Sequence, residues 1–144
     1  MLKFHPARGT LLLCAYEPGF VAPEMVKRRV VVVMSPRLRR RDGLCTVIPL
    51  SQTAPSEVCD FHVRVPMEPE LPDPWAGAEK WAKADMMATV GFHRLHLIGD
   101  GRKEGGQRKY LTPRLSEEKV KEIECAMLCA LGLGSLTNHA RFTT

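Results

Sequence analysis

The sequence predicts a mainly β protein with a single amphipathic helix near its C-terminal end, built as a small barrel or a strongly bent sheet. Two observations lead to this class. Short apolar runs separated by Gly, Pro and charged residues recur along most of the chain, and helical periodicity appears only after residue 116. A chain of 144 residues is long enough to bury one core. We therefore expect one domain over residues 1–134, followed by a flexible tail over 135–144.

Four strands are expected in the first half of the chain. Residues 9–16, 29–35 and 44–50 are short apolar runs, and the third follows an Asp-Gly turn signal. Residues 58–65 alternate apolar and polar side chains, as a half-buried strand does.

The middle of the chain is less regular. Residues 66–79 are rich in proline and acidic residues, which predicts a surface excursion. We expect a strand over 81–90, a bend at Gly91 and another short element over 92–98. The glycine-rich segment 99–109 predicts a flexible basic loop.

The C-terminal helix has the clearest signals. Ser116 is a good N-cap, and acidic residues in the first turn suit the positive end of a helix. Gly132 ends the run. Apolar residues recur at helical spacing and predict one buried face: Val120, Ile123, Met127 and Leu131.

The charge pattern favours an anionic partner. The formal net charge is +5 and the pI is near 9.1. Cations are concentrated on both sides of the apolar run Val30–Val33, over 27–29 and 37–41. Such clustering favours nucleic acid over a membrane surface.

We expect a cytoplasmic protein without a membrane segment. No apolar stretch is long enough to span a bilayer, and the first residues lack the apolar core of a signal peptide. The five cysteines show no C-x-x-C spacing, so we interpret them as reduced thiols.

No cofactor or metal site is predicted. His93 and His96 are three residues apart with Asp85 nearby, but an extended chain would send the two imidazoles to opposite faces. No zinc-binding or phosphate-binding loop signature is present.

Several side chains could nevertheless carry chemistry. Arg29 begins a strand, where its guanidinium could match a phosphate, although a solvated strand flank is the simpler alternative. Ser51, Gln52 and Thr53 end a strand and could hold a phosphate oxygen, or form an ordinary turn. Lys83 and Asp85 would share one face of a strand, as a carboxylate base beside a cation or as a surface ion pair.

Four segments lie in order ahead of the terminal helix: RGTLLLCAY, KRRVVVVMSP, TVIPLSQTAP and KADMMATVGFHRL. Together with the helix they resemble the PemK/MazF toxins of bacterial toxin–antitoxin systems, over residues 7–132. The last segment retains Asp85, Thr89, Arg94 and Leu95 of the family pattern. The chain differs at Thr10, where an acid is usual, and at Val30, where proline is common.

This resemblance implies an SH3-like antiparallel β-barrel of the PemK/MazF/CcdB type and a homodimer. It also implies a growth-inhibiting endoribonuclease that cleaves single-stranded RNA at selected sequences without metal and is neutralised by a cognate antitoxin. Without a metal, the obvious nucleophile is the RNA's own 2′-hydroxyl, which would leave a 2′,3′-cyclic phosphate and a 5′-hydroxyl.

Carried over by position, the resemblance implies catalytic roles for Arg29, Ser51, Lys83 and Asp85. His62 is an alternative general base, and the sequence leaves the choice between it and Asp85 open. The residues expected to bind RNA are Arg28, Arg37, Gln52, Thr53 and Thr89.

Two other functions stay open at this point. The chain could be a non-catalytic toxin on the same fold, like the related gyrase poisons. It could also be a small basic module that binds RNA without cutting it.

Overall fold

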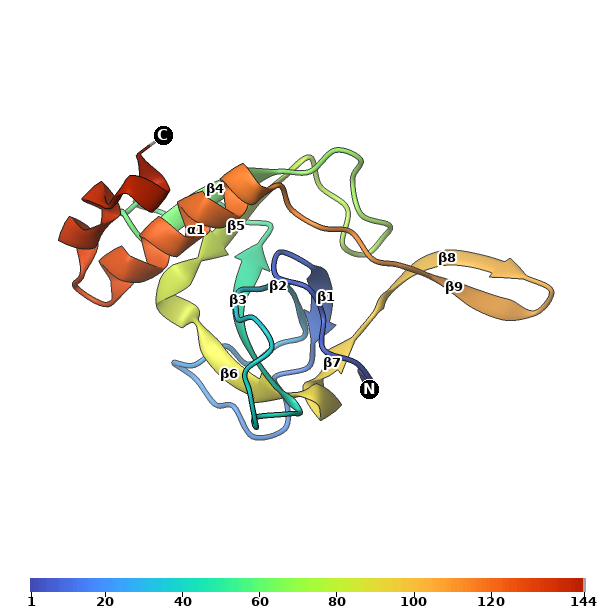
Figure 1. Cartoon of the computed structure of the whole chain (residues 1–144). Helices are drawn as coiled ribbons and strands as arrows, with labels where there is room; N and C mark the ends of the chain where they lie inside the picture. The colour runs from blue at the N-terminus through green and yellow to red at the C-terminus, as the bar shows by residue number, and fades with distance from the viewer. Residues whose placement is uncertain (144) are drawn as a thin grey trace.

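The computed structural model describes residues 1–143, and at residues 102–104 it describes the backbone alone. Figure 1 shows a curled sheet with one helix packed along it and a hairpin projecting from the body. The strands are β1 (Leu11–Cys14), β2 (Arg29–Val33), β3 (Leu44–Ser51), β4 (His62–Pro66), β5 (Glu79–Lys83), β6 (Ala88–Gly91), β7 (Leu95–His96), β8 (Ile98–Glu104) and β9 (Gln107–Leu111). The helix is α1 (Glu117–Ala130), and the 3-10 helices are η1 (Ala84–Met86), η2 (Phe92–Arg94), η3 (Gly134–Asn138) and η4 (Ala140–Phe142).

The main sheet is antiparallel and bends around β3. Its order is β4-β5-β3-β2-β1-β7, and β6 pairs with β3 beside this path. One edge of β3 pairs first with β6, over Leu44–Val47, and then with β5, at Leu50 and Ser51. The predicted fold class is confirmed, but within residues 1–143 the strand ladder does not close into a complete barrel.

Both faces of the central strands are buried, which explains why they are apolar without alternation. Val30 and Val32 belong to the core cluster on the side of α1. Val31 and Val33 belong to a second cluster, which the N-terminal segment and the loop over residues 15–28 cover. The run Val30–Val33 is therefore a strand with a core on each side.

Helix α1 packs its apolar face against β4 and η1. Ser116 is the N-cap, because its side chain accepts a hydrogen bond from the Lys119 backbone N–H at 3.1 Å. Val120 and Ile123 are buried in the core as expected. Leu131, expected on the same face, is 62% exposed, because the helix ends at Ala130 and Gly132 turns the chain with φ +76°.

The single strand expected over 81–90 is wrong. The chain pairs with β4 and β3 as β5, turns through η1, and returns to β3 as β6. The turn is anchored by the buried Ala84, whose N–H donates to the Phe61 carbonyl at 3.0 Å. The break lets two segments cover successive parts of one β3 edge. The strand expected from residue 58 begins at His62, after a turn closed by the His62 N–H and the Cys59 carbonyl.

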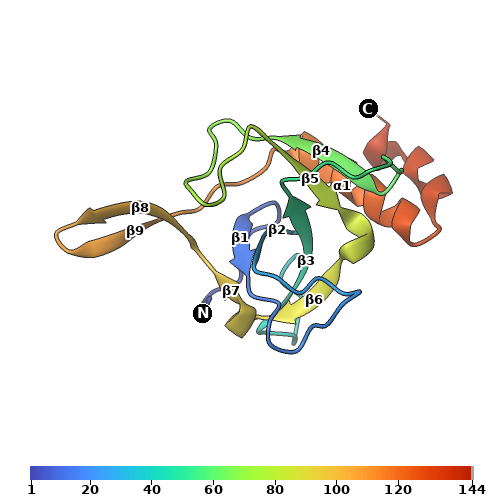
Figure 2. The ribbon, with the colours of Figure 1, turned by 180° about the vertical axis from the view of Figure 1, so that it is seen from behind.

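The flexible loop expected over 99–109 is also wrong, because β8 and β9 form a hairpin there. Its turn is Gly105-Gly106, and both glycines have the positive φ that two-residue hairpin turns require. The hairpin projects away from the body (Figures 1 and 2), and the described side chains of β9 are mostly exposed. Without a buried face, the segment lacks the apolar alternation by which strands are usually found.

The segment expected to be a flexible tail carries η3 and η4. Arg141 of η4 forms an ion pair with Glu124 of α1 at 3.0 Å. Glu124 also pairs with Arg8, so it joins the end of the chain to its beginning.

The position of α1 predicts how two helix substitutions affect stability. Ile123→Ala should lower the free energy of unfolding by about 3 kcal/mol, because Ile123 is fully buried and alanine would leave a cavity. Leu131→Ala is the matched control and should change it by no more than about 0.5 kcal/mol. Urea denaturation of both variants measures this. Equal losses in the two variants would mean that α1 buries a different face.

Candidate functional site

The strand register places Arg29 beside Ser51 at one end of the sheet. Val30 pairs with Leu50, so the next pair outward is Arg29 with Ser51. Arg29 also pairs with Cys14 of β1, and Ser51 pairs with Trp81 of β5. Directly opposed residues of antiparallel strands lie on the same face. Cys14, Arg29, Ser51 and Trp81 therefore form one row, which we call the strand-end row.

Arg29 is the cation of this row, and its guanidinium has a hydrogen-bond donor without a partner among the described residues. The side chain is half-buried, and its Nε is buried without a hydrogen-bond partner in the described part of the chain. Among the ion pairs between side chains that the structure describes, none involves Arg29. The buried Nε is out of reach of an outside ligand, so an anion would meet the terminal nitrogens of the guanidinium, and no existing ion pair would have to break.

Two neutral groups, Tyr16 and Cys14, lie near Arg29. Tyr16 is fully buried, and the Cys14 thiol beside its hydroxyl is at most a weak hydrogen-bond partner. Burial raises the pKa of Tyr16 well above its usual range, and the adjacent Cys14 thiol raises it further. Burial also raises the pKa of Cys14 to about 11, against the opposing effect of the Arg94 charge. Neither group carries a negative charge at neutral pH that would compete for Arg29.

The Ser51 hydroxyl is held in place by the turn that follows β3. It donates to the Thr53 carbonyl and accepts from the Thr53 backbone N–H, both at 3.1 Å. Gln52 donates its side-chain amide to the carbonyls of Pro74 and Ala76, at 3.3 and 3.0 Å. These contacts give Gln52 and Thr53 structural roles in fixing the end of β3, beside Arg29.

Arg94 fixes the loop over residues 15–28 that leads to Arg29. Its guanidinium donates to the Tyr16 carbonyl at 2.7 Å and lies 4.9 Å from the ring centroid of Phe20. Gly19 has φ +116°, and a Cβ there would lie 2.6 Å from Arg94 Nη2. Sequence reasoning noted Arg94 only as part of a family pattern. Its contacts show that it positions the loop.

Lys83, Asp85 and His62 lie further along the sheet. Lys83 pairs with His62 and follows Trp81 by two residues, so it shares the face of the strand-end row. Two strand spacings separate β5 from β2, ~10 Å. His62 Nδ1 accepts a hydrogen bond from the Cys59 N–H at 3.0 Å.

The prediction that Lys83 and Asp85 share a strand face is wrong. β5 ends at Lys83, and Asp85 is an exposed residue of η1. In residues 1–143 no ion pair joins the two side chains.

The remaining expected RNA-binding residues are not gathered at the strand-end row. Arg37 lies in the loop at the opposite end of β2, 3.4 Å from Asp42. Thr89 bonds Thr46 through their hydroxyls at 2.7 Å, and Thr46 precedes Ser51 by ~17 Å along β3. Arg28 is exposed and directly precedes Arg29, so strand alternation sends it to the other face.

The described residues contain no group of three or more His, Cys, Asp or Glu side chains that could hold a metal ion. All five cysteines are free thiols. Within residues 1–143, no helix is both long and apolar enough to cross a membrane.

Comparison with known families matches residues 7–128 to the family described as PemK-like, MazF-like toxin of type II toxin–antitoxin system. The chain belongs to this family, as its sequence resemblance implied.

Two curated relatives span nearly the whole chain. YifN of Escherichia coli strain K12, an uncharacterised protein, is 26% identical over 95% of this chain and 99% of its own length. An uncharacterised protein of Haemophilus influenzae is 28% identical over 94% of this chain and 96% of its own length.

The fold is similar to those of solved toxins. An endoribonuclease from a mycobacterial species, solved in complex with its cognate antitoxin, matches with a TM-score of 0.57 at 21% identity, over 90% of this chain and 97% of that one. MazF from Deinococcus radiodurans matches with a TM-score of 0.57 at 18% identity, over 90% of this chain and 99% of that one. At these identities the likeness establishes the fold.

The buried Tyr16 hydroxyl leads to a stability prediction. A buried hydroxyl with at most a weak thiol partner, here Cys14, gains little in exchange for its lost hydration, so Tyr16→Phe should leave the free energy of unfolding unchanged or raise it by about 1 kcal/mol. Tyr110→Phe, at an exposed hydroxyl, is the matched control and should be neutral. Chemical denaturation of both variants and the wild type measures the free energies of unfolding. If Tyr16→Phe cost more than about 1 kcal/mol, the hydroxyl would have a stabilising partner.

Proposed function

We propose that this protein is a toxin that cleaves single-stranded RNA at selected sequences without a metal ion. It acts in the cytoplasm as a homodimer and is neutralised by a cognate antitoxin. The observation that carries the proposal is the strand-end row, where the half-buried Arg29 has no carboxylate partner among the described residues and lies beside the fixed hydroxyl of Ser51. Membership of the toxin family, and the antitoxin bound to the mycobacterial endoribonuclease, support it.

The reaction uses the substrate's own 2′-hydroxyl as nucleophile. Its oxygen bonds to the adjacent phosphorus, the bond from phosphorus to the 5′-oxygen breaks, and the products are a 2′,3′-cyclic phosphate and a 5′-hydroxyl. A base removes the 2′-proton, and an acid protonates the departing 5′-oxygen. Negative charge gathers on the non-bridging oxygens, where the donors of Arg29 stabilise it, with Lys83 adding positive charge on the same face. The Ser51 O–H, which donates to the Thr53 carbonyl in the free protein, would turn toward the phosphate when substrate binds.

The hydrogen bonding of His62 separates the two candidate bases. Because Nδ1 accepts the Cys59 N–H, the neutral ring carries its proton on Nε2. In that tautomer Nε2 has no free lone pair, so His62 cannot take the 2′-proton, and a neutral imidazole is no general acid, because losing its proton would leave an imidazolate. We therefore assign the base to Asp85, which is exposed and can reach substrate from η1, and the acid to the ammonium group of Lys83. The Nε2–H of His62 can donate a hydrogen bond to the substrate.

The antitoxin would compete with RNA for the same surface. An acidic, extended segment that orders on binding would complement the basic groups around the strand-end row and exclude RNA by occupancy.

The role of Arg29 predicts a large loss of cleavage on its removal. Arg29→Ala should slow RNA cleavage by a factor on the order of 10²–10³, because one preorganised charge contact to the transition state is lost. The rate of cleavage of a defined RNA by purified protein measures this. Lys121→Ala, which removes a charge from α1, should cut at the unchanged rate, and the thermal melts of both variants should match that of the wild type. If Arg29→Ala cut RNA normally, the assignment would be lost; if it still arrested growth without cutting, a non-catalytic toxin would be the better description.

The mechanism also predicts the ends of the products. Long RNA incubated with the purified protein in EDTA should be cut into fragments with 2′,3′-cyclic phosphate and 5′-hydroxyl ends, since no metal takes part. A substrate with a 2′-deoxy sugar at the scissile position should bind and stay intact. End-group analysis by mass spectrometry measures both. Cleavage of the deoxy substrate, or a 5′-phosphate product, would contradict nucleophilic attack by the 2′-hydroxyl.

A further inference from the structure

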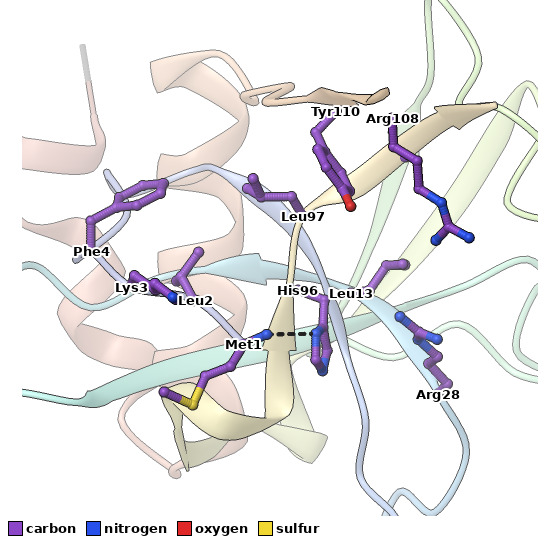
Figure 3. A pocket seen from close by; sticks show the side chains of 11 residues that line it. Met1, Leu2, Lys3, Phe4, Leu13, Arg28, His96, Leu97, Arg108 and Tyr110 are labelled. Atoms are coloured by element: carbon purple, nitrogen blue, oxygen red, sulfur yellow. Dashed lines mark hydrogen bonds between the residues drawn. The ribbon is translucent and has the colours of Figure 1, made fainter. Parts of the chain in front are cut away.

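A pocket separate from the strand-end row lies at the base of the hairpin formed by β8 and β9. Its volume is about 590 Å³. Its walls come from the N-terminal segment, β1, β7 and the hairpin (Figure 3). Sequence reasoning did not find it, because these segments are far apart in the chain. We call it the hairpin pocket.

The hairpin pocket is positively charged. Lys3, Arg28 and Arg108 line it, and none of the described residues that line it is acidic. In Figure 3 the side chains of Arg28 and Arg108 lie on the same side of His96, with Leu13 on that side too. The pKa of His96 is lowered, first by burial and then by nearby positive charge that includes Arg28. The pocket is therefore suited to an anion.

Aromatic side chains accompany these cations. Tyr110 is 52% exposed and Phe4 is 53% exposed, while Leu13 forms part of the apolar wall. An exposed ring among arginines is the combination that binds single-stranded nucleic acid, because the ring stacks on a base while the cations hold the backbone. An acidic peptide would need the cations alone and leave the ring unused.

The hairpin pocket is also close to the strand-end row. Arg28 and Arg29 are consecutive, so their Cα atoms are ~3.8 Å apart and their side chains leave opposite faces of the sheet end. An RNA strand that crosses this end with its scissile phosphate at Arg29 passes within reach of Arg28. One continuous ligand can therefore occupy both places.

We propose that the hairpin pocket is a second RNA subsite, which binds a nucleotide that flanks the cleaved bond. Arg28 and Arg108 hold its phosphate, and its base stacks on Tyr110. This inference rests on the proposed function only in taking RNA as the ligand. It predicts that the hairpin contributes to the length of RNA recognised and not to the chemical step.

Binding of RNA that cannot be cut tests the subsite independently of catalysis. The probes are two fluorescent 2′-deoxy-substituted RNAs of mixed sequence, one of about 16 nucleotides and one of about 4. Tyr110→Ala should weaken binding of the long RNA about tenfold, whereas Tyr110→Phe keeps the stacking face and should bind within about twofold of wild type. Arg108→Ala should weaken it and reduce the slope of log K against log salt by about 0.7, as for one lost phosphate contact. Lys121→Ala controls for the loss of one charge.

The length dependence gives the deciding contrast. The short RNA should occupy the strand-end row alone, so the variants at Arg108 and Tyr110 should bind it with the affinity of the wild type. Their thermal melts should also be unchanged. Wild-type affinity of both variants for the long RNA would overturn the subsite, even if the protein cleaves RNA. Loss of antitoxin binding with RNA binding intact would also overturn it, and would assign the pocket to a protein partner. RNA binding that depends on the pocket in a protein that never cuts would support the subsite while refuting the proposed function.

Discussion

The register between β2 and β3 is the constraint on which the rest of the site depends. Val30 pairs with Leu50 and Val33 with Val47, and this alignment places Arg29 beside Ser51. A slip of one residue would send every side chain of β2 to the other face and remove Arg29 from the row. The valines of β2 make that slip costly, because they are buried in cores on both sides of the sheet. The apolar run Val30–Val33, between the two basic clusters, thus determines the position of Arg29, the candidate catalytic cation.

Positive charge near this end of the sheet is divided between two surfaces. Arg29 lies on one face with neutral Tyr16 and Cys14 nearby, and Arg28 lies on the other, in the hairpin pocket. The sheet end is therefore an edge with a cation on each side, and a polyanion can fold over it. The basic cluster over 37–41 follows the opposite end of β2, at a distance from the strand-end row, and can contribute to general attraction of an anionic ligand.

The elements with strong local signals could be predicted from sequence, and those defined by tertiary pairing could not. Ser116 and the spacing of Val120 and Ile123 were sufficient to place α1. The break at η1 exists because β3 needs two partners on one edge, which no local pattern encodes, and it separated Asp85 from Lys83. The hairpin was missed because its strands bury no face. At the site, the sequence offered Arg29 and Ser51 as candidates, and their roles stay predictions; their adjacency came only from the register. The hairpin pocket could not be predicted, because it brings the N-terminal segment together with residues 96–110, which are far away in the sequence.

The central claim is that Arg29 and Ser51 act together on one phosphate. A double-mutant cycle on RNA cleavage tests this most directly, using Arg29→Ala, Ser51→Ala and the double variant under single-turnover conditions. Since both side chains would serve the same transition state, the double variant should lose less than the sum of the two single losses, with a coupling free energy of roughly 0.5–3 kcal/mol. Strict additivity, with each loss independent of the other, would show that the two residues do not share a phosphate.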